Sequence, residues 1–308
     1  MDYQSEGGIF AGNLLIDVLD ANGAQQGERD VGETSNFTIE AMKITDKQRT
    51  GHRIENFGNL IDDIILSKTQ SLKFTLGDIN RKNLALAMFG EDSAIDVSSS
   101  SVTDEAITAR LDKEMKLSKM KIKSSPAVVV SVAAPSAWQT EHAYVLTNFV
   151  LAGTYRAECT TAGTSGVSEP TWTGKVPGET VTDGTVTWTI RKLTYTLDTD
   201  YEIDYTYGTI TALSDGDIAE EQSLLVDFSY DAYTGYNVNA ATLTKIDCLL
   251  RLKGKNINTG KPVMVIVHKA SLKPSGSIDW ITDDFAKLEF SGDIQAVGAD
   301  TWEALALD

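Results

Sequence analysis

A stretch near the end of the chain, residues 249–297, constrains the fold most strongly because it alternates in the manner of extended backbone. The run VMVIVH at residues 263–268 places three valines on one face of a predicted strand and Met, Ile and His on the other, so both faces are largely apolar. Pro274 and Gly276 then supply turn chemistry. The following run FAKLEF, residues 285–290, alternates apolar with charged residues, which predicts one buried and one wet face. Because a few short strands are marginally stable alone, the rest of the chain must complete the core.

Earlier segments supply further strand patterns. Residues 12–19 read as a strand, Asn22-Gly23 is a strong hairpin turn signal, and the partner strand is expected to resume near Glu28. Residues 34–44 and 69–76 alternate in the same way. We therefore predict a mainly β fold, a β-sandwich or barrel.

One segment has a helical pattern. Residues 81–89 are expected to form a short helix, with Asp78 or Asn80 as its N-cap and Gly90 as a left-handed residue that ends it. One side of this helix is apolar and is expected to lie across a sheet; it carries Leu84, Ala87 and Met88. Two segments lack a clean period and are interpreted as loops, residues 45–66 and 94–104.

The middle of the chain has a different character. Residues 126–134 and 195–230 look like two halves of one small β-sandwich, and residues 138–192 between them form a nested module rich in Thr and Gly. With 308 residues, two domains or one domain with a large insertion are expected. The predicted organisation is a core formed by two parts and interrupted by an inserted β-domain: 1–125, 126–235 and 236–308.

Charge and composition exclude several functions. The chain has 27 Lys and Arg against 44 Asp and Glu, a net charge of −17, which is too acidic for a protein that grips nucleic acid by its phosphates. Cys159 and Cys248 follow no spacing pattern and are expected to be free, buried thiols in an intracellular protein. The sequence contains neither a signal peptide nor a membrane-spanning run, so a soluble protein made in the cytoplasm is expected.

No residue pattern points to catalysis or to a cofactor. The carboxylates of residues 198–204 lack the central Gly and terminal Glu of a calcium loop, and a solvated strand edge is the better interpretation. The three histidines lie in separate segments, which argues against a catalytic triad or zinc site; they are His52, His142 and His268. The run GTSG at residues 163–166 reads as a turn, not as a phosphate loop. We expect no enzymatic activity, no metal and no cofactor.

Three tryptophans lie in the nested module, Trp138, Trp172 and Trp188. Exposed aromatic rings stack on the apolar faces of sugars, so they are candidates for a glycan-binding platform. The alternative is that they form the core of a small β-module.

A resemblance to a known protein family is carried by three runs of the sequence. They are SNFTIEA, QSLKFTLGDINRKNLALAMFG and, far downstream, LRLKGKNINTGKPVMVIVHKASLKPSGSIDWITDDFAKLEFSGDIQ. Their order resembles the major tail tube proteins of long-tailed (siphovirus-type) bacteriophages, over residues 8–123 and 240–297. The nested module is similar to an accessory β-repeat of phage tail and fibre proteins in its phrases AGTSGVSEPTW and TVTDGTVTW. A minimal tube protein has no such insertion, so the module implies an outward-facing decoration.

The resemblance implies a β-sandwich or barrel with a flanking helix that assembles into stacked hexameric rings around a DNA channel. It also implies partners, namely other copies of the chain, a tape measure protein, and tail terminator and tip proteins, with DNA only in transit. The expected location is the virion tail, after synthesis in the host bacterial cytoplasm. Two physical arguments agree: ring closure covers exposed sheet edges, and a negative channel wall lets DNA slide.

Residues 45–66 occupy the place of the stacking loop of such proteins. Apolar anchors in a polar arm would fill pockets on a neighbouring ring. The candidate inter-ring contacts are Arg53, Ile54, Phe57, Leu60, Ile61 and Ile64. The alternative is that residues 54–66 fold back on their own domain as an edge strand.

An alternative function belongs to another class. The chain would be a phage tail or virion adhesion protein whose inserted modules bind a cell-surface glycan or another partner. Stacked rings with a central hole would favour the tube, and discrete monomers or trimers would favour adhesion.

Overall fold

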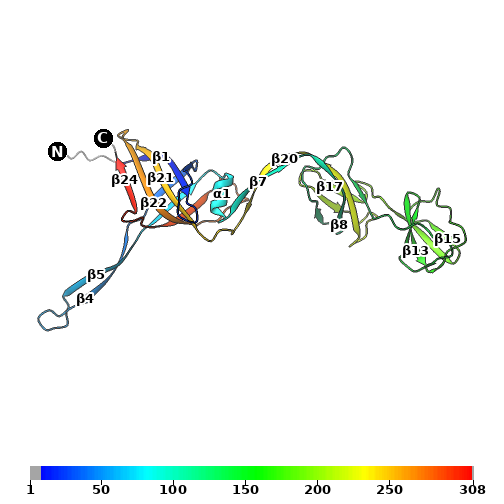
Figure 1. Cartoon of the computed structure of the whole chain (residues 1–308), viewed down its shortest axis with the longest axis horizontal. Coiled ribbons are helices and arrows are strands. Elements are labelled where there is room, and N and C mark those ends of the chain that lie inside the picture. The colour runs from blue at the N-terminus through cyan, green and yellow to red at the C-terminus, as the bar shows by residue number, and fades with distance from the viewer. Residues whose placement is uncertain (1–7, 307–308) are drawn as a thin grey trace. The chain divides into compact units, whose positions relative to one another are not determined.

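The computed structural model describes residues 8–306, and in that part the chain is mainly β, with α1 (Arg81–Ala87) as its helix. The predicted mainly β fold with one helix is confirmed. The chain divides into two compact units (Figure 1): unit 1 comprises Met1–Ile95 and Gly235–Asp308, and unit 2 comprises Asp96–Thr234.

Unit 1 is built on one antiparallel eight-stranded sheet. Its strand order is β2-β1-β21-β22-β23-β6-β3, and β24 pairs with β22 beside β23. The strands of this sheet are β1 (Phe10–Val18), β2 (Arg29–Asp30), β3 (Thr34–Ile39), β6 (Ser71–Leu76), β21 (Ile246–Asn256), β22 (Pro262–Pro274), β23 (Leu288–Ile294) and β24 (Trp302–Ala306).

The predicted central strand is β22, which pairs with β21 along one edge and with β23 and β24 along the other. The predicted turn at Pro274 comes at the end of β22, and residues 275–287 form a loop before β23. Leu288 and Phe290 are buried, whereas Glu289 between them is exposed, as the alternation predicts. The Phe290 ring stacks on Phe74 of β6, with centroids 4.9 Å apart.

Helix α1 has the predicted N-cap, since Asn80 Oδ1 accepts a hydrogen bond from the Asn83 backbone N–H at 3.0 Å. Its predicted apolar face is wrong in detail. The helix buries four consecutive residues, Asn83 to Leu86, and the Asn83 amide donates to the carbonyls of Val31 and Asp78.

The predicted role of Gly90 is also wrong. The left-handed residue after the helix is Phe89, with φ of +50°. A Cβ on Gly90 would lie 2.1 Å from the Asn239 carbonyl oxygen, so glycine is needed there for the close approach of two backbone segments.

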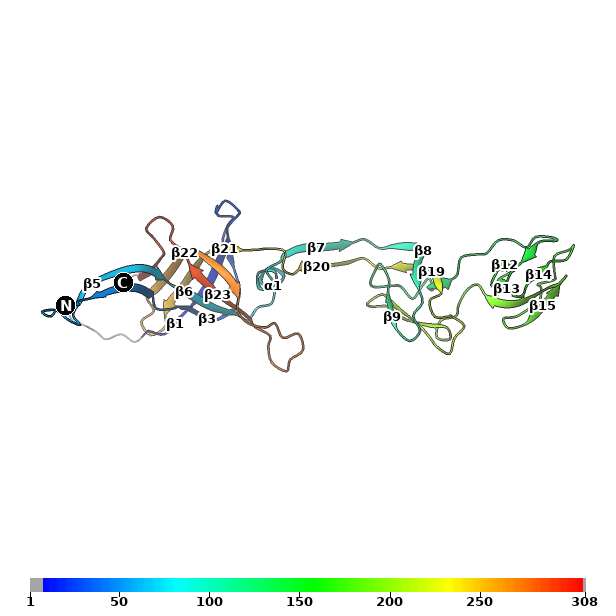
Figure 2. The same ribbon diagram turned by 90° about the horizontal axis from the view of Figure 1, so that it is seen from below.

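Residues 45–66 are not an irregular loop. They belong to a two-stranded antiparallel hairpin, β4 (Lys43–Thr50) and β5 (Leu60–Thr69), which projects from the sheet of unit 1 at the end opposite α1 (Figure 2). The alternative of an edge strand on the same domain is also wrong, because β4 and β5 pair only with each other among the described strands.

The predicted loop 94–104 is wrong as well. It contains the end of β7 (Glu91–Val97), which pairs with β20 (Tyr233–Asn239), and the start of β8 (Ser100–Thr108). Its small polar residues face water, while Val97 and Val102 pack against the core of unit 2. Strand β8 pairs with β19, so unit 2 begins at Asp96 instead of the predicted residue 126.

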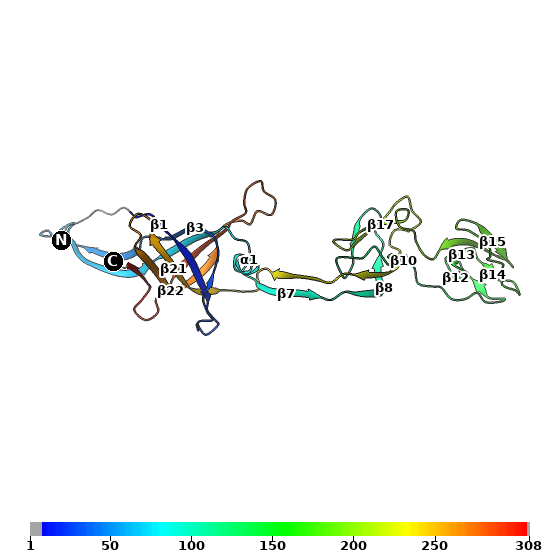
Figure 3. The ribbon, with the colours of Figure 1, turned by 90° about the horizontal axis from the view of Figure 1, so that it is seen from above.

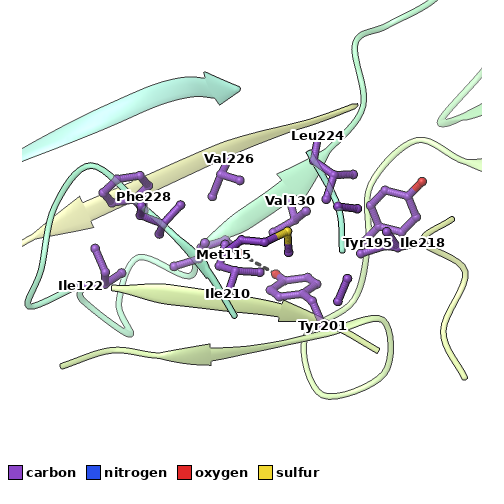
Figure 4. Packing of buried hydrophobic residues seen from close by; sticks show 14 of the residues in the cluster. Met115, Ile122, Val130, Tyr195, Tyr201, Ile210, Ile218, Leu224, Val226 and Phe228 are labelled. Carbon is purple, nitrogen blue, oxygen red and sulfur yellow. Dashed lines mark hydrogen bonds between the residues drawn. The ribbon is translucent and has the colours of Figure 1, made fainter. Parts of the chain in front are cut away.

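Unit 2 contains two three-stranded sheets, β10-β19-β8 and β17-β18-β9. Their buried side chains form one cluster (Figure 4), in which the Tyr201 hydroxyl donates to the Val128 carbonyl at 3.0 Å. The remaining strands of these sheets are β9 (Glu114–Lys116), β10 (Val129–Ser131), β17 (Tyr201–Asp204), β18 (Thr209–Ala212) and β19 (Ser223–Tyr230).

The nested module has its own sheets, β12-β13-β16-β15 and β11-β14, and its own buried cluster. The chain leaves for the module and returns side by side, because the Val132 N–H donates to the Leu193 carbonyl at 3.0 Å. The module strands are β11 (Ala143–Tyr144), β12 (Phe149–Ala152), β13 (Tyr155–Thr161), β14 (Gly163–Thr164), β15 (Thr180–Asp183) and β16 (Val186–Lys192).

Lys192, the last residue of β16, ties the module to the rest of unit 2. Its ammonium lies 2.8 Å from the fully buried carboxylate of Asp200 and 2.7 Å from Asp217. Burial by itself raises the pKa of Asp200, but hydrogen bonds from Lys192 and from the backbone N–H groups of Asp217 and Thr196 outweigh it. The pKa of Asp200 therefore lies below its ordinary value.

The ion pair between Lys192 and Asp200 predicts different outcomes for two deletions, each closed by a short Gly/Ser turn. Removing residues 138–191 is expected to leave unit 2 folded, because the two chain ends already lie together. Removing residues 138–192 also takes away Lys192 and leaves buried Asp200 without its cation. The second deletion should therefore lose about 3 kcal/mol of unfolding free energy relative to the first, measured by urea denaturation at pH 7.

The difference should depend on pH with a fixed sign. Because the folded-state pKa of Asp200 is lowered, its stabilising contribution is present above the ordinary pKa of an aspartate and is lost as the pH falls through the folded-state value. The two deletions should thus converge in stability in acid. Equal stability of the two deletion variants at pH 7 would mean that the Lys192–Asp200 ion pair does not stabilise unit 2.

Candidate assembly surface

The hairpin β4–β5 is exposed along its whole length. All residues of both strands are exposed, although many of the side chains are large and apolar. Apart from the tip, the exposed apolar residues are Met42, Ile44, Leu60, Ile61, Ile64, Ile65 and Leu66. Burying one such side chain contributes about 1.5–3 kcal/mol, so this ribbon leaves a large stabilisation unused in the isolated chain.

Both faces of the hairpin carry exposed aliphatic side chains, most of them from β5. Ile64 and Ile65 are consecutive, and successive side chains of a strand point to opposite faces. Lys47 pairs with Ile64 and Asp46 with Ile65 across the ladder, so neither aliphatic side chain has an apolar partner directly opposite. A two-stranded ribbon is marginally stable alone. A partner on either face of the hairpin would bury exposed aliphatic side chains.

The tip of the hairpin, residues 51–59, is a defined turn. The Gly51 N–H donates to the Asn59 carbonyl at 2.8 Å, and the Gly58 N–H donates to the Gly51 carbonyl at 3.0 Å. Gly58 has φ of +81°, a conformation that favours glycine. This turn presents Ile54 and Phe57, which are 98% and 75% exposed.

The charges of the hairpin are distributed unevenly. Arg49 pairs with Asp62 at 2.5 Å. Farther from the tip, desolvation and the neighbouring Asp46 carboxyl raise the pKa of Asp63. Deprotonation therefore adds repulsion between the two strands, which disfavours the isolated ribbon further.

The six predicted contact residues all lie on this hairpin. Arg53, Ile54 and Phe57 share the tip, and Leu60, Ile61 and Ile64 lie on β5. The sequence interpretation missed the contribution of β4 and the end of β5, namely Ile44, Ile65 and Leu66. The consecutive apolar residues 64–66 are a signal that could have revealed a ribbon with two apolar faces.

A second exposed apolar group lies in the loop 275–287 between β22 and β23. Trp280, Ile281 and Phe285 are 69%, 99% and 89% exposed. The sequence interpretation placed a turn at Pro274 and Gly276 and a strand from Phe285 onward, so it missed this exposed group; the strand begins only at Leu288. Large apolar side chains that gather in this way on a surface mark interaction sites.

A groove of about 330 Å³ is lined by residues of β3 and of the strands β1, β21, β22 and β24. Its lining is mostly apolar and includes Phe10, Phe37, Leu252, Val265 and Trp302.

The predicted tryptophan platform is wrong for Trp188, which is fully buried at the centre of the nested module. The indoles of Trp188 and Trp138 both donate to Asp183 Oδ2, at 3.1 and 2.7 Å, and Asp183 Oδ1 accepts from the Gly166 N–H. These contacts join three segments of the module. Trp138 and Trp188 therefore have a structural role.

Trp172 is half-buried, as Trp138 is, but it lines an open hollow of about 620 Å³ together with Tyr155, Glu169 and Lys175. Its ring meets Trp188 edge to face. Its indole donates to Glu169 at 2.8 Å.

The remaining candidate residues have structural contacts. The ring of His142 packs on Tyr144, and His268 lies 4.0 Å from Glu303. Asp204 accepts hydrogen bonds from the N–H groups of the turn that follows it. Within residues 8–306 no group of three or more His, Cys, Asp or Glu could hold a metal ion.

Both cysteines are buried, and burial raises the pKa of the Cys248 thiol well above its ordinary value. In the described part of the chain, no helix is long and apolar enough to span a membrane.

The family model described as protein of unknown function UCP028589 matches residues 8–158 and 150–302. Together these segments span most of the chain and both units. No curated protein matches the sequence.

The buried Trp188 and the half-buried Trp172 predict different mutational effects. Trp188→Ala is expected to unfold the nested module or cost it about 3–5 kcal/mol, because a large side chain is removed from a closed core. Trp172→Ala should cost clearly less, since its ring borders solvent. Near-ultraviolet circular dichroism and thermal unfolding of the two variants distinguish these outcomes; a folded, undisturbed Trp188→Ala variant would contradict the structural role.

Proposed function

We propose that this chain, which belongs to the family described as protein of unknown function UCP028589, is a structural subunit. Copies of the chain assemble into stacked hexameric rings, which form the tail tube of a bacteriophage. DNA passes through this tube without being tightly bound. The chain is not an enzyme; it is located in the virion tail and is made in the host bacterial cytoplasm.

The observation that carries this proposal is the hairpin β4–β5, whose two strands are exposed throughout and carry aliphatic side chains on both faces. An isolated subunit gains nothing from such an arm, which lowers its solubility. Against neighbouring copies the same side chains exclude water and stabilise an interface. The arm belongs to the segment that the tail tube resemblance assigns to ring stacking.

The sheet of unit 1 supports ring formation. Its strand order ends at β2 and β3, each of which pairs with a single neighbour among the described strands. Free sheet edges invite pairing with other chains, and a closed ring removes them. Ring closure thus limits an interaction that would otherwise spread without control.

The charge balance supports transit of DNA. Of the 27 Lys and Arg and 44 Asp and Glu, unit 2 contains 10 and 20, which leaves 17 and 24 in unit 1. Both units are therefore acidic, with net charges of −10 and −7. An acidic wall repels phosphates and disfavours tight binding. The resemblance adds a tape measure protein and tail terminator and tip proteins as partners.

A second candidate function is adhesion through the inserted modules, as part of a phage tail or virion. It is supported by one observation, the open hollow beside Trp172 with Tyr155 and two charged side chains. An aromatic ring and flanking polar groups suit a glycan. The two functions are separated by electron microscopy of the purified protein: stacked rings support the tube, and discrete monomers or trimers support adhesion.

The double change Ile54→Ser with Phe57→Ser tests the role of the arm. The variant is expected to fold like the wild type, because both side chains are exposed in the subunit, but to form no tubes by negative-stain electron microscopy. The matched control is Val145→Ser with Leu146→Ser, which alters two exposed apolar residues of the nested module. The control should still polymerise.

Unfolding of the Ile54→Ser, Phe57→Ser variant would place the tip in the core of the subunit. Long tubes formed by this variant would show that stacking depends on another surface.

A further inference from the structure

The loop 275–287 combines exposed apolar side chains with acidic ones. Its three large apolar residues, Trp280, Ile281 and Phe285, are interspersed with Asp279, Asp283 and Asp284. In the described part of the chain, none of these three carboxylates has an ion-pair partner. The loop therefore presents apolar surface framed by unpaired negative charge.

The hairpin has the complementary character where β4 leads into the tip. The run KQRTGHR, residues 47–53, contains three cations and no carboxylate, although the chain as a whole is strongly acidic and the tip itself adds one carboxylate, Glu55. Arg49 is paired with Asp62, while Lys47 and Arg53 have no ion-pair partner among the described residues. Ile54 and Phe57 supply the apolar part of this tip.

The two surfaces lie at opposite ends of unit 1. Ser71 of β6, which follows the hairpin directly, is in register with Asp293, whereas Leu76 at the other end of β6 is in register with Leu288, which follows the loop. Figures 2 and 3 show the hairpin at one end of the unit and α1 at the other. Strand β4 alone adds roughly 25 Å beyond the sheet at about 3.3 Å per residue. The tip of one copy therefore cannot reach its own loop.

Two complementary surfaces at opposite ends of one molecule make a heterologous, head-to-tail contact. Repetition of such a contact without closure builds an open stack. Opposite charges at its rim fix orientation and register, and the apolar centre excludes water. The acidic loop is poorly suited to nucleic acid or to an anionic membrane, since both would be repelled.

We propose that the loop 275–287 is the receptor for the hairpin tip of the next copy in the stack. Ile54 and Phe57 pack against Trp280, Ile281 and Phe285, while Lys47 and Arg53 face the carboxylates of the loop. This inference rests on the proposed function and names the partner surface within it.

Charge reversal on each side tests the pairing in the full chain. Lys47→Glu with Arg53→Glu reverses one charge of β4 and one of the tip, and Asp283→Lys with Asp284→Lys reverses two charges of the loop. Each reversal alone is expected to abolish tubes by electron microscopy and to lower the pelleted fraction at least tenfold. The variant with all four changes is expected to recover assembly. As a matched control, Glu202→Lys with Asp215→Lys reverses two exposed charges of unit 2 and should assemble like the wild type.

A thiol cross-linking experiment supplies a second measurement that does not depend on recovery. Because both native cysteines are buried, Phe57→Cys and Ile281→Cys each introduce one accessible thiol. A bifunctional thiol reagent added to a mixed assembly of the two variants should yield a dimer that joins the hairpin of one copy to the loop of another, identified by peptide mass spectrometry.

The outcomes separate this inference from the proposed function. Wild-type tubes together with normal assembly of the loop reversal would overturn the inference and leave the tube proposal standing. Failure of the four-residue variant together with absence of the Phe57–Ile281 cross-link would also overturn it. If the wild-type chain itself forms no rings or tubes, the proposed function fails, and the inference fails with it.

Discussion

Strand β22 is the element on which unit 1 depends, because it pairs with three other strands. Its 13 residues pair with β21 along one edge, while the other edge is divided between β24 at residues 263–267 and β23 at residues 270–274. Val267, Ala270 and Leu272 enter the core from this strand. Strand β23 pairs in turn with β6. The hairpin leaves the sheet at one end of β6, and the loop 275–287 lies at the other end. The position of both exposed apolar groups therefore follows from the register of one strand.

The sequence predicted these central strands because their burial leaves a period-two signal. The apolar run at residues 263–268 and the alternation of Leu288, Glu289 and Phe290 correspond to β22 and β23. The cap of α1 at Asn80 was predictable for a similar local reason, since an Asn side chain satisfies the first free N–H groups. The end of the helix was not, because Gly90 is required by its distant neighbour Asn239.

The hairpin could be located from the sequence but its structure could not. Its strands face water on both sides in the isolated chain, so no alternation between a core face and a solvent face exists to be detected. The candidate residues Ile54 to Ile64 were identified as exposed apolar anchors, yet Ile65, Leu66 and the loop around Trp280 were missed for the same reason. Trp188 shows the opposite error, since the type of residue alone does not distinguish an exposed platform from a core. The boundary at Asp96 was missed because the contacts of β8 with β19 are distant in sequence.

These features describe a subunit whose stable parts and whose interacting parts are separate. The sheet of unit 1 and the clusters of unit 2 are closed cores, and the nested module enters and leaves unit 2 through neighbouring strands. The hairpin and the loop 275–287 contribute little to these cores and leave large apolar side chains in water. The proposed contact with further copies would bury both surfaces, and both belong to the unit that the tail tube resemblance covers.

Hydrogen exchange of the hairpin amides, compared between the free subunit and the assembled protein, tests self-assembly through this arm most directly. In the free subunit, β4 and β5 are expected to exchange quickly, because an isolated two-stranded ribbon opens readily. In the assembled protein the same amides should become protected, while those of β22 are protected in both states. Fast exchange of β4 and β5 in an assembled state would contradict a role of the hairpin in joining the subunits.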